Sequence, residues 1–402
     1  MITRTLYLDR IRPFMYKPVI KVLTGLRRSG KSVLLTQIRD LLLADGVPSK
    51  NIVSINLESA KYHAILNSDQ FTRLIHEQAP EATGKVFFLL DEVQNVEGWE
   101  RTIASLMVDF DSDIYITGSN SKLLSGELAT HIAGRYIEFQ VFPFSFKEFI
   151  EVSPPGKTTD EYFDDYRQLG GMPFLHFLNF DPTTSRDYLQ GVFDSVMIKD
   201  IVGRREIRDV DLLRRVIWFV MANIGNPYSA RSIATYFKSE NRIVATETVL
   251  NYLDACVEAC LFQRVANQDL VGKRILKVDE KYYLTDHGFR SLVSMPTNRD
   301  IGLILENLVC IELLRRGFQV QIGRIEGNEI DFVATKAGRP IYFQVAYLIP
   351  DSQTHDREVR PLLKVVDNYP KYILTMDPIT IQEQGIIHQR IPEFLLDTGQ
   401  FE

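Results

Sequence analysis

The sequence predicts an α/β fold with a parallel sheet, and three observations lead to that class. Val19, Ile20, Val22 and Leu23 form a short apolar run that leads into a glycine-rich loop and then into a helical pattern. Residues 86–90 and 113–117 read as two more strands, each followed by polar residues. Short apolar runs of this kind are typical of strands that are buried on both faces, as they are in parallel sheets.

The loop after the first strand, Gly25–Ser32, reads GLRRSGKS and matches the phosphate-binding pattern G-x-x-x-x-G-K-[ST] at every fixed position. Gly25 and Gly30 permit backbone angles that let successive N–H groups turn toward phosphate oxygens. Lys31 would bring a positive charge to the β- and γ-phosphates at a helix N-terminus, and the Ser32 hydroxyl can ligate Mg²⁺. The expected nucleotide-binding residues are Gly25, Leu26, Arg27, Arg28, Ser29, Gly30, Lys31, Ser32 and Val33.

The second strand ends in Asp91 and Glu92. An apolar run that ends in two carboxylates looks like a Walker B motif, in which Asp91 would join the Mg²⁺ shell together with Ser32. Glu92 would then polarise the attacking water as a general base. Many strands end in Asp, so this interpretation depends on the complete phosphate loop upstream. The cofactors expected from the two motifs are ATP and Mg²⁺.

Further motifs follow in a characteristic order. The chain reads ITGSNSKLLSG from Ile116, GR at 134–135, FPFSFKEF from Phe142 and GGMP from Gly170. Together with the two motifs above, this order resembles a large prokaryotic family of AAA-type ATP-binding proteins that carry a C-terminal domain of unknown function. The resemblance covers essentially the whole chain, and it implies an architecture more than a substrate.

The resemblance also implies roles for three residues. Ser119 and Asn120 follow the third strand, where AAA-type ATPases place a polar sensor that contacts the γ-phosphate or the attacking water. A turn that caps the next helix is the alternative for these two residues. Arg135 would reach the nucleotide of a neighbouring subunit and stabilise charge during transfer, which implies a homo-oligomer. An ordinary surface arginine is the alternative there.

Composition narrows the class further. The chain has 402 residues, of which 45% are hydrophobic and 24% charged, as in soluble proteins of several domains. It contains no apolar run long enough to span a bilayer and no signal-peptide core, so we expect a cytoplasmic protein without membrane contact. Cys256 and Cys260, one helical turn apart, are expected as small buried hydrophobes rather than metal ligands. The net charge of −6 leaves any DNA contact to a local patch.

Residues 211–289 read as three helices and a hairpin, an order that resembles a winged helix. The third of these helices, 246–260, carries Glu247, Asp254 and Glu258 and no Lys or Arg, which argues against reading of the DNA major groove. DNA contact would therefore depend on the hairpin, and protein or subunit contact is the alternative. The candidates for contacts to DNA phosphates are Arg264, Lys273, Arg274, Lys277 and Lys281.

The last part of the chain resembles the PD-(D/E)xK nucleases. Glu306 lies in an expected helix, Asp331 in a strand, and Gln344 and Ala346 in the strand that follows. In those nucleases acidic groups hold Mg²⁺ and a lysine positions the nucleophile. Gln344 and Ala346 stand where that pattern has Glu and Lys, so we expect a nuclease-like fold that has lost ordinary nuclease activity. An active, ATP-coupled nuclease is the alternative.

These expectations divide the chain into four segments. They are a P-loop AAA-type ATPase domain (1–155), a helical lid or linker (156–205), a winged-helix domain (206–292) and a nuclease-like α/β domain (297–402). The expected function is that of an oligomeric ATP-hydrolysing protein that acts on DNA or is regulated by it. The alternative is a nucleotide-controlled switch that engages a protein partner without binding DNA.

Overall fold

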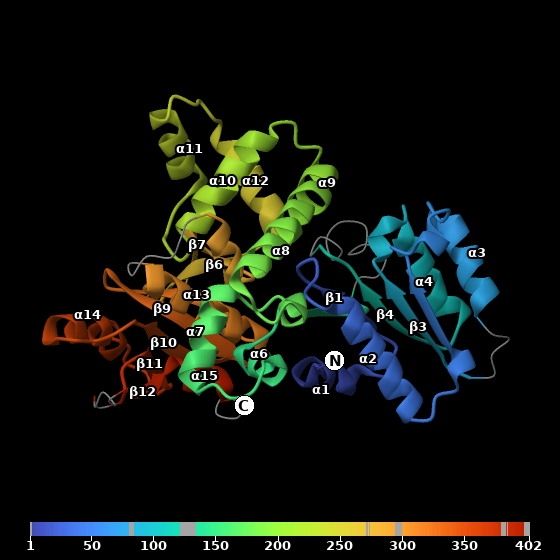
Figure 1. Ribbon diagram of the computed structural model, residues 1–402, viewed down its shortest axis with the longest axis horizontal. Helices are drawn as coiled ribbons and strands as arrows, with labels where there is room; N and C mark the ends of the chain where they lie inside the picture. The colour runs from blue at the N-terminus through green and yellow to red at the C-terminus, as the bar shows by residue number, and fades with distance from the viewer. Residues whose placement is uncertain are drawn as a thin grey trace. The chain divides into compact units, whose positions relative to one another are not determined.

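The computed structural model describes residues 2–79, 84–120, 134–270, 272, 274–293, 300–378, 383 and 385–397, with 274–279 described by their backbone alone. The chain forms two compact units (Figure 1). The first comprises Met1–Val141 and the short segment Glu258–Cys260, and the second comprises Phe142–Val257 and Leu261–Glu402. Each unit has its own sheet and its own hydrophobic core.

A five-stranded sheet with the order β2-β3-β4-β1-β5 forms the centre of the first unit. Its strands are β1 (Ile20–Thr24), β2 (Ile52–Asn56), β3 (Val86–Asp91), β4 (Ser112–Thr117) and β5 (Tyr136–Gln140). Every neighbouring pair is parallel, so the carboxyl ends of the strands meet at one edge. The register places Asn56 beside Asp91 and Leu23 beside Thr117 there. The predicted α/β fold with a parallel sheet is confirmed.

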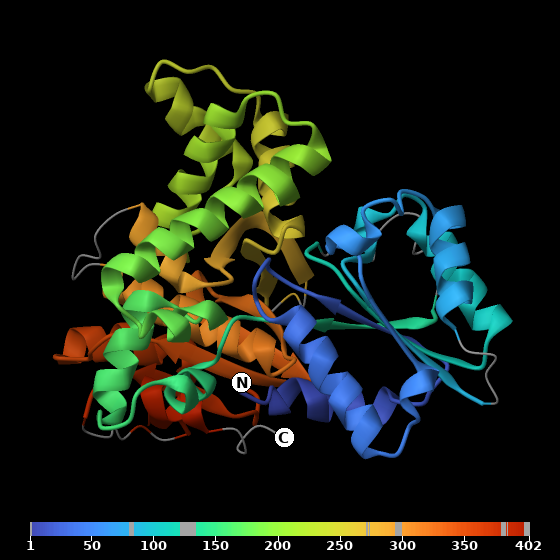
Figure 2. The ribbon, with the colours of Figure 1, turned by 45° about the vertical axis from the view of Figure 1, so that its right-hand side comes forward.

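Helices cover both faces of this sheet. They are α1 (Thr5–Ile11), α2 (Lys31–Ala44), α3 (Ser68–Gln78) and α4 (Trp99–Asp109). Helices α1 and α2 pack on one face, and α3 and α4 pack on the other (Figures 1 and 2). Phe87 and Leu89 of β3 join the core under α1 and α2, while Phe88 and Leu90 join the core under α3 and α4. Burial on both faces is the reason that this strand is apolar without alternation.

The second unit begins with helices and contains a seven-stranded sheet. Its helices are α6 (Phe146–Val152), α7 (Thr159–Leu169), α8 (Pro182–Ser195), α9 (Gly203–Arg205), α10 (Val210–Ala222), α11 (Ala230–Ser239), α12 (Thr246–Glu258), α13 (Ile301–Arg315), α14 (Ser352–Leu363) and α15 (Ile391–Leu396). Its strands are β6 (Phe262–Asp269), β7 (Arg274–Leu284), β8 (Gln319–Ile325), β9 (Asn328–Lys336), β10 (Arg339–Val345), β11 (Lys371–Thr375) and β12 (Ile387–Arg390). A π-helical stretch, Val196–Val202, links α8 to α9.

The strand order of this sheet is β12-β11-β10-β9-β8-β6-β7. The hairpin β6–β7 follows α10, α11 and α12, and β6 then pairs in parallel with β8, with Asn267 beside Ile322. The hairpin of the expected winged helix and the strands of the expected nuclease-like domain therefore belong to one sheet. The four-segment division stays a prediction, and the shared sheet is an arrangement that it did not anticipate.

The GGMP motif lies where three segments of the second unit come into close contact, namely the motif itself, the residues around Phe144 and the residues around Asp286. The Gly171 N–H donates to Asp286 Oδ2 at 2.9 Å, and the Phe144 N–H donates to the Gly171 carbonyl at 2.7 Å. Asp286 Oδ1 accepts from the Gly288 N–H at 2.9 Å. Gly170 has φ +87°, and a Cβ on this residue would overlap Asp286 Oδ1. Burial raises the pKa of Asp286 to about 6, although its two N–H donors oppose that shift.

Two expectations from composition can be compared with the structure. In the part of the chain that the structure describes, no helix combines the length and apolar character needed to cross a membrane. Cys256, Cys260 and Cys310 are free thiols and all three are buried, which confirms the predicted burial of the first two. Burial raises the pKa of the Cys256 and Cys310 thiols.

Candidate active site

The phosphate loop connects the end of β1 to the start of α2. Gly25 has φ +138°, and a Cβ on this residue would overlap the Val141 carbonyl oxygen, so only glycine fits there. Gly30 is left-handed and forms the N-cap of α2, with φ +99°. The first turn of α2 contains no acidic residue, so the helix itself supplies no carboxylate that offsets its positive end. This geometry suits a bound phosphate.

Lys31 is 4% exposed and curls back over its own loop. Its Nζ donates to the carbonyls of Gly25 at 2.9 Å and Leu26 at 3.0 Å. The Ser29 hydroxyl is buried in the same loop, and its oxygen has no hydrogen-bond partner among the described residues. The buried Lys31 ammonium and the unpartnered Ser29 hydroxyl are both hydrogen-bond donors within this loop. They fit a triphosphate, whose oxygens would accept from both groups.

The carboxylates predicted for the second strand lie at the same edge of the sheet. Asp91 is buried at the end of β3, where it accepts from Asn56 Nδ2 at 3.1 Å and from the Thr117 hydroxyl. The Thr117 hydroxyl oxygen in turn accepts from the Glu92 N–H at 2.9 Å. Thr117 therefore links both carboxylate residues to the end of β4. Both of these partners of Asp91, the Asn56 amide and the Thr117 hydroxyl, are neutral.

Glu92 has a strained backbone. Its φ is +55°, the left-handed region that residues with a Cβ rarely adopt. Its side chain is nearly buried, and Glu92 Oε2 accepts from Gln94 Nε2. Strain of this kind persists only where the surrounding structure enforces it, and it is often found at active sites. The left-handed backbone at Glu92 therefore gives its side chain a different direction from that of a residue that continued β3.

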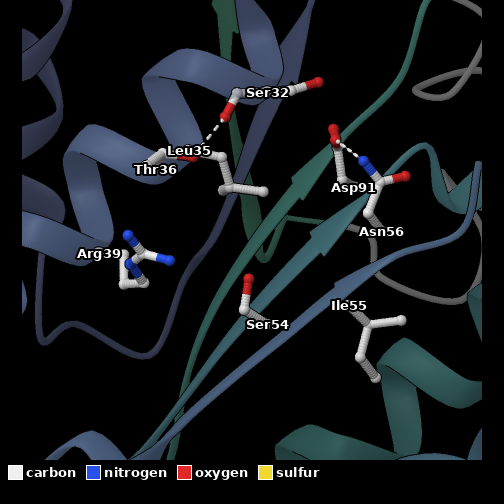
Figure 3. A pocket seen from close by; sticks show the side chains of 8 residues that line it. All are labelled: Ser32, Leu35, Thr36, Arg39, Ser54, Ile55, Asn56 and Asp91. Atoms are coloured by element: carbon white, nitrogen blue, oxygen red, sulfur yellow. Dashed lines mark hydrogen bonds between the residues drawn. The ribbon is translucent and has the colours of Figure 1, made fainter. Parts of the chain in front are cut away.

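A pocket of about 110 Å³ lies beside the loop, between α2 and the strands β2 and β3 (Figure 3). Its lining residues are Ser32, Leu35, Thr36, Arg39, Ser54, Ile55, Asn56 and Asp91. Ser32 and Asp91, the two residues predicted to hold Mg²⁺, thus line one pocket, and Asn56 adds a side-chain amide (Figure 3). Hydroxyl, carboxylate and amide oxygens are the ligands that a hard cation prefers, so the donors present fit Mg²⁺.

The remaining predicted residues of the first unit lie around this edge. Ser119 and Asn120 are buried directly after β4. Arg135 is exposed immediately before β5. Arg27 forms an ion pair with Glu58, with Nη1 3.2 Å from Oε1. The segment 121–133, which completes the ITGSNSKLLSG motif, lies outside the described residues.

Three residues at this site were not predicted from the sequence. Asn56 and Thr117 are the last residues of β2 and β4, and the rule that parallel strands end at one edge would have identified them. Arg4 is buried and donates from Nη1 to the Ser29 carbonyl at 3.1 Å, which supports the phosphate loop from the N-terminal segment. No sequence pattern distinguishes Arg4 from an ordinary basic residue.

The second unit contains a separate cluster of charged groups, and it corrects one prediction. Lys281 on β7 is 3% exposed, so its ammonium group cannot contact DNA phosphates. Its Nζ lies 2.9 Å from Glu306 Oε1 on α13 and 2.6 Å from Glu329 Oε1 on β9. The Tyr283 hydroxyl donates to the same Glu306 oxygen at 2.6 Å. Burial lowers the pKa of Lys281, but the charges of Glu306, Asp331 and Glu329 outweigh it and raise the pKa overall.

Of the other residues predicted to contact DNA, one has an acidic partner and the side chains of three lie outside the described part of the chain. Arg264 pairs with Asp254 of α12, with Nη1 2.7 Å from Oδ1. Lys273 lies outside the described residues, as do the side chains of Arg274 and Lys277. The prediction of phosphate contacts at these last three positions therefore stays a prediction.

The nuclease-like residues come together, but with the Lys281 ammonium against Glu306 and Glu329 they do not form a site for a divalent metal. Asp331 Oδ2 accepts from the Val345 N–H at 2.8 Å, and Gln344 Nε2 donates to Glu358 Oε2 at 2.9 Å. Burial and the negative charge of Glu306 raise the pKa of Asp331 well above its ordinary value, although Lys281 opposes the shift. Within the described ranges, no group of three His, Cys, Asp or Glu side chains is arranged to hold a metal ion.

Comparisons with known proteins agree with this architecture. Residues 17–150 match the family described as an AAA domain, and residues 160–300 match a domain of unknown function, DUF8612. The solved structure of the Walker-type ATPase PABY2304 of Pyrococcus abyssi is similar in fold, with a TM-score of 0.52 and 13% identity, over 73% of this chain and 96% of that one. The family match and the first unit's motifs identify residues 17–150 as an AAA domain with a phosphate loop.

Relatives of full length define the family. An uncharacterized protein of Haemophilus influenzae is 40% identical over 378 residues, which cover 93% of each chain. The uncharacterized protein MJ1544 of Methanocaldococcus jannaschii is 28% identical over 383 residues, 91% of this chain and 83% of that protein. The chain belongs to the family of the Haemophilus protein.

Proposed function

We propose that this protein binds ATP with Mg²⁺ at the carboxyl edge of the first unit's sheet and hydrolyses it. The observation that carries this proposal is the convergence of two motifs on that edge. Ser32 and Asp91 line one pocket, and the hydroxyl of Thr117 joins Asp91 to Glu92. The loop that precedes Ser32 contains the buried ammonium of Lys31.

Each residue has a defined task in this proposal. The N–H groups of the loop and the Lys31 ammonium hold the β- and γ-phosphates, for which Lys31 must exchange the carbonyls of Gly25 and Leu26 for phosphate oxygens. Ser32 and Asp91 would hold Mg²⁺, which when bound neutralises charge on the transferring phosphoryl group. Glu92 accepts the proton of the attacking water. Ser119 and Asn120 are proposed to orient that water or the γ-phosphate.

The direct test replaces the ammonium group. The Lys31→Ala variant should lose ATP binding measured by calorimetry and phosphate release measured in steady state, because the loop carbonyls and amides alone do not compensate the triphosphate charge. Lys50→Ala, at an exposed lysine of the same unit, is the matched control and should leave both unchanged. Unchanged turnover in Lys31→Ala would refute the assignment of the phosphate loop.

Oligomerisation is part of the same proposal. Arg135 is exposed directly before β5, where a side chain is accessible to a neighbouring subunit. We propose that it stabilises the γ-phosphate charge of that neighbour's nucleotide. Arg135→Ala should then lower turnover while sparing ATP affinity, and the molar mass in solution should rise with ATP. A fully active monomer would contradict this part.

For the second unit, we propose the role of a nucleotide-controlled switch that engages a protein partner, in preference to action on DNA. Its α12 carries no Lys or Arg, Arg264 is paired with Asp254, and Lys281 is buried. Binding to DNA phosphates depends on accessible cations, and these three observations reduce the number of such cations among the described residues. The winged-helix-like order of α10, α11, α12 and the β6–β7 hairpin also suits contacts to protein.

A panel of duplex, single-stranded and branched DNA distinguishes the two roles. At low salt, none of the three should bind or change ATP turnover if the partner is a protein. Salt-sensitive binding that is lost when Arg274 and Lys277 are both replaced by Ala would contradict the switch and restore the DNA role.

A further inference from the structure

The ammonium group of Lys281 occupies the middle of an acidic cluster. It is 3% exposed, and it bridges Glu306 of α13 to Glu329 of β9 at 2.9 and 2.6 Å. Asp331, two residues further along β9, is close enough to contribute to the charge that acts on Lys281. Two carboxylates from two elements thus share one ammonium that the chain itself supplies from a third element, and Glu329 Oε2 also pairs with Arg324 Nη2 at 2.8 Å.

This cluster includes the carboxylates with which a nuclease of this layout would bind its metal. Glu306 and Asp331 stand at the predicted metal-ligand positions, and Glu329 joins them in the structure. Gln344 stands where the pattern has a third carboxylate, and its side-chain amide donates a hydrogen bond to Glu358. Ala346 provides no ammonium group at the position where the pattern has a lysine.

We propose that the Lys281 ammonium is a fixed internal cation that takes the place of a divalent metal ion among Glu306, Glu329 and Asp331. A buried carboxylate needs a cation or hydrogen-bond donors, and a metal ion and an ammonium both satisfy that need. The ammonium differs from a metal ion in two respects. It cannot exchange with solvent, and it cannot activate a water molecule as a metal does. The second unit is therefore independent of metal and does not cut nucleic acid.

The position of Lys281 in the chain adds a structural consequence. Lys281 belongs to β7, whereas its two carboxylate partners belong to α13 and β9. The interaction therefore ties the hairpin of the winged-helix-like region to the helix and strand of the nuclease-like region. It does so beside Tyr283, whose hydroxyl donates to the same oxygen of Glu306. This proposal does not depend on ATP binding at the first unit.

The proposal is tested by removing the cation and offering a metal. Lys281→Met keeps the aliphatic stem and removes the charge. In the full-length variant without nucleotide, Mn²⁺ titrated by calorimetry and followed by electron paramagnetic resonance should show one more bound ion per chain than in the wild type. The phosphate loop is identical in both proteins, so any Mn²⁺ that it binds cancels in the comparison.

A second variant assigns the extra ion. Adding Glu306→Gln and Glu329→Gln to Lys281→Met should abolish the additional Mn²⁺ site, since two of its three charged ligands are gone. If Lys281→Met does not fold in metal-free buffer, millimolar Mn²⁺ or Ca²⁺ during refolding should restore its native circular dichroism spectrum and solubility. Failure of both ions to restore it would count against the proposal.

Two results would overturn the proposal outright. One is a folded Lys281→Met protein that binds no more Mn²⁺ than the wild type. The other is metal-dependent cleavage of DNA by the wild type that Lys281→Met loses, which would make Lys281 a catalytic residue. Neither result bears on the function proposed for the first unit, because the acidic cluster belongs to the second unit and ATP turnover is measured separately.

Discussion

Asp91 in the first unit and Asp331 in the second are both buried carboxylates on sheet strands, yet their neighbours differ in charge. Asp91 is held by the neutral side chains of Asn56 and Thr117 and lines a pocket. Asp331 belongs to a cluster that contains the ammonium of Lys281. We therefore expect a buried carboxylate on a strand to hold a metal cation only where no fixed cation already compensates it.

The difference extends to the units as a whole. The first unit brings its polar groups to the open edge of a parallel sheet, where ligands bind in many α/β proteins. The nuclease-like residues of the second unit instead lie among paired charges, as in Lys281 with Glu306, a kind of pairing that the first unit shows away from that edge, in Lys21 with Asp113. Substitutions in the first set should change turnover, and substitutions in the second should change stability. The following predictions test that distinction, from the largest expected effect to the smallest.

Glu92→Gln should lower ATP turnover by roughly 10²- to 10⁴-fold while leaving ATP bound, because the amide cannot accept the proton of the attacking water. Single-turnover hydrolysis and calorimetric binding measure the two quantities separately. Glu77→Gln, at an exposed glutamate of α3, is the control and should have no effect on either. Normal turnover in Glu92→Gln would remove Glu92 from the proposed chemistry.

The contrast between these residues also shows what the sequence could predict. The phosphate loop and the strand that ends in Asp91 and Glu92 each carry a local signal, so their meeting at one edge followed from the rule for parallel strands. Lys281 has no such signal. It reads as one of several basic residues of a hairpin, and its burial depends on Glu306 and Glu329, which lie far along the chain.

The same reasoning applies to the fold. Three strands of the five-stranded parallel sheet, β1, β3 and β4, were predicted because each is a mostly apolar run followed by a recognisable loop, whereas β2 and β5 were not predicted. The seven-stranded sheet was not predicted, because it depends on the pairing of β6 with β8, which are separated by α13. No residue pattern within β6 or β8 specifies that partner. The pairing arises from tertiary packing, which acts over distances that sequence periodicity does not report.

Thr117→Val should reduce turnover by about tenfold, because the valine keeps the shape but removes the donor to Asp91 and the acceptor for the Glu92 N–H. Loss of these hydrogen bonds should also destabilise the unit by about 1–3 kcal/mol. Thr102→Val is the matched control, a buried threonine of α4 that donates to the Ser68 carbonyl. It should lower stability alone, measured by urea denaturation. Equal turnover in the two variants would contradict the role given to Thr117.

Gly170→Ala should destabilise the second unit by about 2 kcal/mol or more without a specific effect on ATP affinity, since the added Cβ overlaps Asp286 and the φ of +87° is strained. Gly338→Ala separates the two causes. Gly338 has φ +77° in the same unit but nothing within 4 Å of its added Cβ, so only the cost of strain, about 1 kcal/mol, should remain. Chemical denaturation followed by tyrosine fluorescence measures both. Equal losses would mean that the contact with Asp286 contributes nothing.

Magnesium dependence of ATP binding tests the central claim most directly. Calorimetry with the wild type should show that Mg²⁺ tightens ATP binding, and the Asp91→Asn variant should bind ATP but lose most of that gain, because the amide replaces the charged ligand. Absence of adenine nucleotide binding by the wild type in the presence of Mg²⁺ would contradict the account, as would an equal Mg²⁺ effect in the wild type and in Asp91→Asn.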